Sequence, residues 1–115
     1  MPELWTLGGI TVMGMFVHIT RRKFWAQKQN GRDITADEWR QYVQSDPEFR
    51  MPGTGGPDFA DWLVAPGRWL GWMDGEICAQ RPDAVFITKM HAVARKLGAI
   101  VQDDDGTIYD DTKAA

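Results

Sequence analysis

Three side chains in this sequence could act as a base, a nucleophile or a soft metal ligand: His18, His91 and Cys78. A catalytic pair needs a histidine within hydrogen-bond reach of a nucleophile or a carboxylate. The spacing enforces no such contact, because His18 lies in a predicted strand and His91 lies half exposed on a predicted helix. Cys78 has no basic neighbour in the sequence that would activate its thiol. We therefore expect structural or surface roles for all three and no enzymatic activity.

The most suggestive polar feature is the acidic run Asp103, Asp104 and Asp105, followed by Asp110. A hard cation such as calcium needs several carboxylates that converge on one point. The segment DDDGTIYDD does not match an EF-hand, because its glycine comes too early and the bidentate glutamate is missing. The carboxylates could instead solvate the end of a hairpin with a turn at Asp105-Gly106, form an acidic patch that faces a basic partner, or bind a metal.

The six tryptophans are many for 115 residues. Trp39 belongs to the apolar stripe of a predicted helix. Trp69 and Trp72 lie three residues apart in one predicted strand, so they point to opposite faces and cannot share one core. Trp62, beside a Gly- and Pro-rich loop at residues 52–58, is a second candidate for exposure. Tryptophan is enriched in interface hot spots, so these side chains are candidate contact residues, with core packing as the alternative.

Composition predicts one globular domain over residues 1–115, with 43% hydrophobic and 25% charged residues. The net charge of −3 is uneven, because the residues from 58 onwards carry six Lys or Arg against ten Asp or Glu. An acidic half repels phosphates and favours basic partners, so nucleic-acid binding is not expected. No cofactor and no metal site are expected either.

Cys78 is the only cysteine, so the chain cannot form an internal disulfide. The apolar N-terminal stretch lacks the basic region of a signal peptide, and no membrane span is visible, which predicts a cytoplasmic protein. We expect residues 1–12 to be a loosely ordered extension and residues 111–115 to be a frayed tail.

The first half of the chain predicts a strand within residues 10–20 and one helix. Thr35 is a good N-cap, and Glu38 completes a capping box. Ile34 can pack on Trp39 as a hydrophobic staple, and Pro47 excludes continuation, so the helix should cover about 36 to 45. A short extended segment could follow at residues 48–51.

The second half predicts strands in FADWLVAP, RWLGW and EICAQ, with a tight turn at Asp74-Gly75. A second helix is expected to begin at Pro82 as its first residue and to stop at Gly98. Strands AIVQD and TIYD follow around Asp105-Gly106. The order β-α-β-β-β-α-β-β predicts an α+β domain, in which two helices pack on a largely antiparallel sheet.

Several segments together resemble a family of small uncharacterised bacterial proteins: HITRRKFW, ITADEWRQYVQSDPEFR, WMDGEICAQRPD, ITKMHAVARKLGA and VQDDDGTIYD. The resemblance covers most of residues 16–110. The chain departs from the family pattern at Arg81, where the pattern has Asn and a good N-cap, and at Asp103, where it has Gly.

Proteins of this kind look like those encoded beside polymorphic toxins, where small acidic proteins often serve as immunity proteins. The resemblance therefore implies a protein that occludes the active site of a cognate toxin, one with a basic cleft. The expected contact residues are Trp62, Trp69, Trp72, Asp74, Asp103, Asp104, Asp105 and Asp110. The alternatives are a small metal- or ligand-binding domain and a homo-oligomeric structural or regulatory subunit, such as a homodimer.

Overall fold

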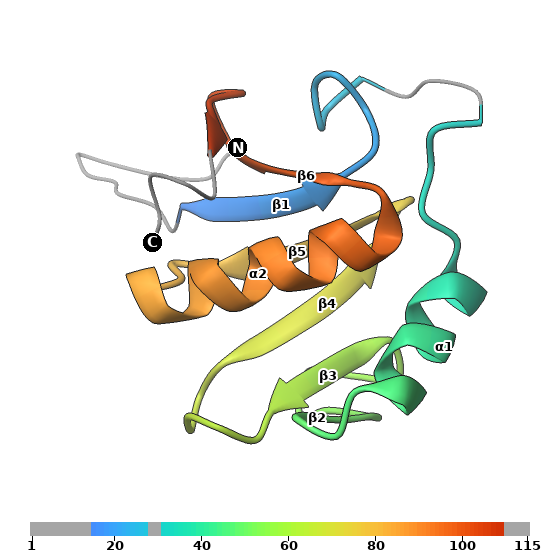
Figure 1. Cartoon of the computed structure of the whole chain (residues 1–115), viewed down its shortest axis with the longest axis vertical. Helices are drawn as coiled ribbons and strands as arrows, with labels where there is room; N and C mark the ends of the chain where they lie inside the picture. Colours follow the sequence, from blue (N-terminus) through green and yellow to red (C-terminus); the bar gives the residue numbers. More distant parts are fainter. Residues whose placement is uncertain (1–14, 28–30, 110–115) are drawn as a thin grey trace.

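The computed structural model describes residues 15–27 and 31–109, which form a seven-stranded antiparallel sheet with two α-helices on one face (Figure 1). The spatial order of the strands is β2-β3-β4-β5-β1-β6-β7. No helix in the described residues is long and apolar enough to cross a membrane. In chain order the elements are β1 (Phe16–Thr20), α1 (Ala36–Ser45), β2 (Phe49–Arg50), β3 (Phe59–Trp62), β4 (Trp69–Met73), β5 (Glu76–Gln80), α2 (Ala84–Leu97), β6 (Ile100–Asp103) and β7 (Ile108–Tyr109).

The predicted α+β class is confirmed, and the element order agrees with one addition. The short extended segment after α1 pairs with β3 and becomes the two-residue strand β2. The predicted first strand is observed from Phe16, and Met15 is described but lies before the strand. Residues 1–14 and 110–115, which include the predicted extension 1–12 and the predicted tail 111–115, lie outside the described residues.

The hydrophobic core lies between the sheet and the two helices. Alternate strand residues such as Ile19 and Ile77 point toward the helices and are fully buried, as the two-residue period of a strand requires. Each helix contributes one apolar face to this core. The buried helical residues are Trp39 and Val43 of α1 and Phe86, Met90, His91, Val93 and Ala94 of α2.

Local signals in the sequence set most element boundaries correctly. Helix α1 begins after Thr35, whose hydroxyl oxygen accepts from the Glu38 amide while the Glu38 carboxylate accepts from the Thr35 amide. Asp74 and Gly75 both have positive φ, at 53° and 88°, as a two-residue type I′ hairpin turn requires. Gly98 ends α2 in the left-handed conformation.

Two predictions about α2 are wrong. The helix begins at Ala84 rather than Pro82, because the Asp83 carboxylate accepts from the Phe86 amide and makes Asp83 the N-cap. His91 is buried rather than half exposed, at 6% relative exposure. The helix therefore has a good N-cap without an asparagine at position 81, and Arg81 instead lies in the left-handed region with φ 48°.

Among the described residues, no helix lies on the opposite face of the sheet, and two loops pack on it instead. The loop at residues 52–58 closes over the Phe59 ring, so closely that a Cβ on Gly55 would lie 2.5 Å from it. Gly71 approaches the same ring from β4, and Trp69 packs on it with centroids 5.1 Å apart. The segment 21–27 covers the other end of this face, over β1 and β6.

Candidate functional site

The candidate site begins with His18, which the alternation of β1 turns onto the helix-free face. Its Nδ1 contacts Glu76 of β5, and its Nε2 lies 2.8 Å from Oδ1 of Asp104 after β6. Burial by itself lowers the pKa of His18, but the hydrogen bonds and charges of Glu76 and then Asp104 outweigh it and raise the pKa above 6.5. With a carboxylate at each ring nitrogen, the site favours the imidazolium form of His18, which can donate to both.

Arg22 extends this network and is almost fully buried, at 3% relative exposure. Its guanidinium makes five hydrogen bonds, two to Asp33, one to Glu76 and one each to the backbone carbonyls of Trp25 and Asp74. A guanidinium has five N–H groups, so these bonds match its whole donor capacity. Glu76 lies between the two cations, with one oxygen toward His18 and the other toward Arg22.

The same network fixes the segment 21–27 on the sheet. The Trp25 ring stacks on the His18 ring, with centroids 4.0 Å apart and planes 8° apart. The Trp25 indole donates to the backbone carbonyl of Asp104, and its amide donates to the buried side chain of Gln102. The segment is therefore fixed to β1 by the stacked ring of Trp25 and to the β6 region by hydrogen bonds from its indole and its backbone amide.

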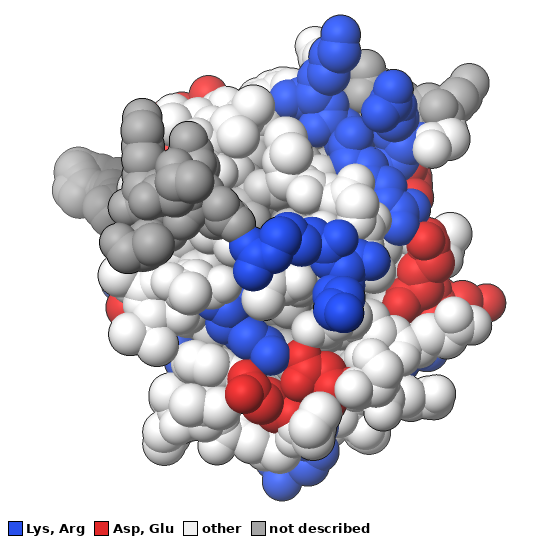
Figure 2. Space-filling model, in the orientation of Figure 1, with Lys and Arg blue, Asp and Glu red and all other residues white. Residues whose placement is uncertain are grey.

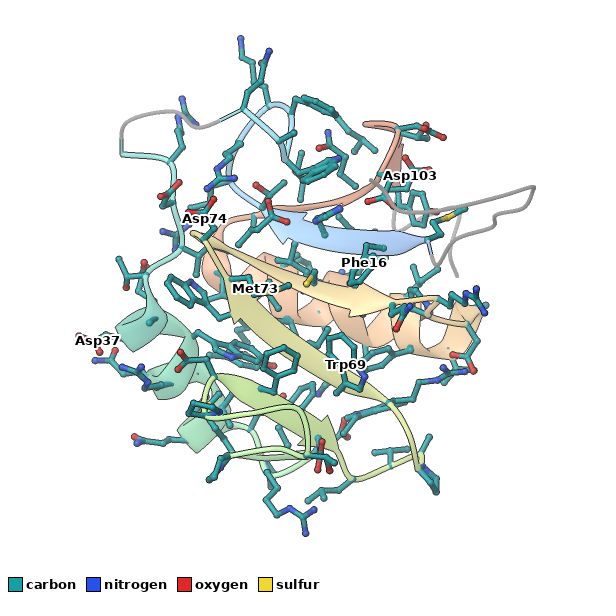
Figure 3. The ribbon with its side chains drawn as sticks, turned by 180° about the vertical axis from the view of Figure 1, so that it is seen from behind. Phe16, Asp37, Trp69, Met73, Asp74 and Asp103 are labelled. Carbon is teal, nitrogen blue, oxygen red and sulfur yellow. The ribbon has the colours of Figure 1, made fainter. Side chains whose placement is uncertain are left out.

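A pocket of about 380 Å³ opens between this segment and the β4–β5 turn. Figure 3 shows this side of the molecule, with Phe16, Trp69 and Met73 on the face turned toward the reader and α2 behind the sheet. Burial, followed by the charges of Glu76 and Asp104, raises the pKa of the Cys78 thiol to about 12, so the thiol is protonated. The pocket is lined by Phe16, His18, Arg22, Trp25, Ala26, Met73, Asp74, Glu76, Cys78 and Asp104.

The acidic hairpin predicted as a contact site divides into residues with different roles. Oδ1 of Asp103 accepts from the amides of Asp105 and Thr107 and closes the β6–β7 turn. Asp104 reaches the pocket, where one oxygen accepts from His18 and the other from the Phe16 amide. Asp105 is exposed at the turn. The hairpin itself is confirmed, with pairing of β6 and β7 on either side of it.

Asp74 lies with Asp104 at the pocket, although 30 positions separate them in the sequence. It is exposed at the β4–β5 turn, next to Met73, which is 45% exposed. Asp110, the remaining predicted contact residue with a carboxylate, lies outside the described residues.

The three predicted contact tryptophans do not share one surface. Trp62 is buried on the helix side, where its indole donates to Glu48. Trp72 is half-buried against the same core, and its indole donates to a backbone carbonyl. Trp69 lies on the helix-free face, half-buried against Phe59. The predicted opposition of Trp69 and Trp72 is confirmed, and Trp69 is the one that leaves the core.

Sequence reasoning did not find the network of His18, Arg22 and Glu76, nor the role of Trp25. One available signal was the alternation of side chains along a strand, which places His18 and Cys78 on the face of the sheet that lies away from the core residues of β1 and β5. Among the residues that the structure describes, no group of three or more His, Cys, Asp or Glu side chains is arranged to hold a metal ion.

These observations define an α+β protein in which two helices cover one face of the sheet and a pocket lies on the other face. Comparison of the chain with models of protein families, with curated proteins and with solved structures finds no match.

Proposed function

We propose that this chain is a binding protein of the immunity class, cytoplasmic and non-enzymatic, which neutralises a toxin by covering its active site. The observation that carries the proposal is the pocket on the helix-free face, where an apolar floor meets the carboxylates of Asp74 and Asp104. The acidic second half of the chain supports the choice of a basic protein as partner. The motifs resemble a family of small bacterial proteins that look like those encoded beside polymorphic toxins, which supports the immunity class.

The chemistry of the pocket favours recognition over catalysis. A general base needs an unprotonated atom that can reach a substrate, and both ring nitrogens of His18 are engaged by carboxylates. A nucleophilic cysteine needs a lowered pKa, whereas burial raises that of Cys78. The network instead holds the pocket in one shape before binding, which reduces the entropy that binding costs.

The test starts from affinity purification of the tagged chain from the cells that produce it. The captured partner is then expressed alone and together with the chain in a growth assay. We expect the partner alone to arrest growth and the chain to restore it. A captured partner that is harmless when expressed alone would refute the immunity proposal.

A pair of variants connects that assay to the pocket. Met73→Arg adds bulk and positive charge at the pocket rim and should abolish both capture and rescue. Val85→Arg makes the same kind of change at an equally accessible site, because Val85 is 67% exposed in the first turn of α2. Equal loss of rescue in both variants would exclude the helix-free face as the contact surface.

A second candidate function is supported by the size of the pocket. Sites for small molecules are commonly concave, largely apolar and about 300–1,000 Å³ in volume. The pocket of about 380 Å³ falls at the lower end of that range. This alternative predicts that a small ligand raises the unfolding temperature of the purified chain in a thermal-shift screen.

A further inference from the structure

We propose that His18 is the proton-dependent part of a latch: loss of its proton releases the Asp104 side chain from the pocket, while Glu76 stays in place. The latch consists of these three side chains, which meet on the helix-free face of the sheet. It belongs to the chain alone, so its test needs no partner and is independent of the proposed function.

The ring of His18 lies between two carboxylates that come from different strands. Its Nδ1 contacts Glu76 of β5, and its Nε2 lies 2.8 Å from Oδ1 of Asp104, directly after β6. An imidazolium has two N–H groups, one for each carboxylate, whereas a neutral imidazole has only one. After loss of the proton, one ring nitrogen presents a lone pair to a carboxylate oxygen. Two acceptors that face each other at this distance repel.

Burial decides which of the two carboxylates keeps the remaining N–H group. The Glu76 side chain is 8% exposed, and its second oxygen lies 3.2 Å from Arg22. The Asp104 side chain is 38% exposed, so water can replace His18 as its donor. Taking a donor from a buried carboxylate costs more than hydrating a half-exposed one. The neutral ring therefore keeps its proton on Nδ1, and Asp104 turns to solvent.

The release of Asp104 changes the pocket at one defined place. Oδ2 of Asp104 accepts from the Phe16 amide, and its backbone carbonyl accepts from the Trp25 indole, whose ring stacks on His18. All four residues line the pocket. Withdrawal of the Asp104 side chain exposes the Phe16 amide to water and widens the pocket beside the Trp25 ring. Strand β6 stays in place, because its ladder with β1 ends at Asp103.

The groups around the ring set the direction of the latch. Burial lowers the pKa of His18, but the hydrogen bonds and charges of Glu76 and then Asp104 outweigh it and raise the pKa above 6.5. The latch is therefore closed at low pH and opens as the pH rises through the titration of His18. Burial raises the pKa of the Cys78 thiol to about 12, and a guanidinium is always charged, so neither group changes charge in that range. The titratable and charged groups that face the ring or the pocket around it are Glu76 and Cys78 of β5, Asp104 after β6, Arg22 of the segment 21–27, and Asp74 at the rim.

The second histidine is separated from the latch by the sheet. His91 is buried in α2, on the helix side of the molecule. Figure 2 shows that side, where Lys and Arg side chains lie over α2. Those side chains keep their charge while an imidazole titrates, so His91 is the group whose titration has to be distinguished from that of His18. The nitrogen signals of the two rings make this distinction in solution.

The experiment is an NMR pH titration of the full chain that records the nitrogen signals of both imidazole rings and hydrogen exchange of the Phe16 amide. We expect neutral His18 to carry its proton on Nδ1. The protection factor of the Phe16 amide should fall by up to about tenfold per pH unit through the titration of His18, the steepest dependence that one proton allows. A neutral His18 with its proton on Nε2, or protection that does not follow His18, would overturn the proposal.

Asp104→Asn tests the latch by removing the carboxylate while keeping the shape of the side chain. The asparagine nitrogen can donate to Nε2 of a neutral ring while its oxygen accepts from the Phe16 amide. We therefore expect this variant to keep the Phe16 amide protected after His18 has lost its proton. Asp105→Asn is the matched control, at an exposed residue of the same turn, and should lose protection as the wild type does. The same pH response in both variants would contradict the assignment.

Discussion

Substitution of Glu76 by glutamine should be among the most destabilising single changes in the described part of the chain. Glu76 is 6% exposed and lies between the buried charges of His18 and Arg22. A glutamine at this position would keep the shape of the side chain but remove the buried counter-charge that both cations share, so that only Asp104 remains for His18 and only Asp33 for Arg22. Removal of one partner from a buried ion pair costs about 3–5 kcal/mol, a large part of the roughly 5–15 kcal/mol that stabilises a typical domain.

The assay is urea unfolding followed by tryptophan fluorescence, at a pH below 6.5 where His18 is charged in both states. Glu48→Gln is the matched control, because the Glu48 side chain is 46% exposed and pairs with Lys89 at 2.9 Å. We expect the control to lose about 1 kcal/mol or less, as half-exposed ion pairs do.

A double variant gives an independent check on the same reasoning. If the loss in Glu76→Gln comes from uncompensated charge, then adding Arg22→Met should make the second substitution much less costly than it is alone. Strict additivity of the two changes, or a loss in Glu76→Gln no larger than in Glu48→Gln, would refute the description of this network.

Three further predictions concern single residues. The pKa of His18 is raised in the folded state, so its contribution to the free energy of unfolding is complete below pH 6.5 and is lost as the pH rises through the folded-state pKa. Between these two pKa values the wild type should lose up to about 1.4 kcal/mol of stability per pH unit relative to His18→Gln. Gly71→Ala places a Cβ 2.7 Å from the Phe59 ring and should cost about 1–3 kcal/mol in urea unfolding, part of which Phe59→Leu restores. Arg81→Asn should stabilise by about 0.5–1 kcal/mol, because asparagine adopts positive φ more readily; a lower unfolding midpoint would contradict this.

The elements of the fold could be predicted because their signals are local. The Thr35–Glu38 capping box, the Asp74-Gly75 turn and the stop at Gly98 each act within a few residues, and all three are confirmed. The predicted start of α2 is wrong for an equally local reason. Both Pro82 as first residue and Asp83 as N-cap are common in helices, and only the hydrogen bond to the Phe86 amide decides between them.

The site could not be predicted in the same way, because its contacts are distant in sequence. His18 meets Glu76 across 58 positions and Asp104 across 86. These contacts exist because β1, the first strand described, lies between β5 and β6 in the sheet. The two-residue period of a strand determines which face His18 occupies, but it does not determine which strands are its neighbours.

The acidic run shows how the strand order changes the meaning of a sequence feature. By composition alone Asp103, Asp104 and Asp105 form one patch, yet the structure gives each a different surrounding. Asp103 closes a turn, Asp104 neutralises a buried histidine and Asp105 meets solvent. A charge reversal of the whole run would therefore damage the fold and the pocket together, and it could not isolate electrostatic steering.

Asp74 is the better residue for that purpose, because it is an exposed residue whose backbone carbonyl, rather than its side chain, holds Arg22. A side-chain substitution there changes the charge at the pocket rim and leaves that backbone contact in place. The buried network has a role other than stabilising the fold, because replacing a whole buried ion pair by apolar groups often costs little stability. Its effect is to fix Trp25 and the segment 21–27 against the sheet, which keeps the pocket open at one defined place.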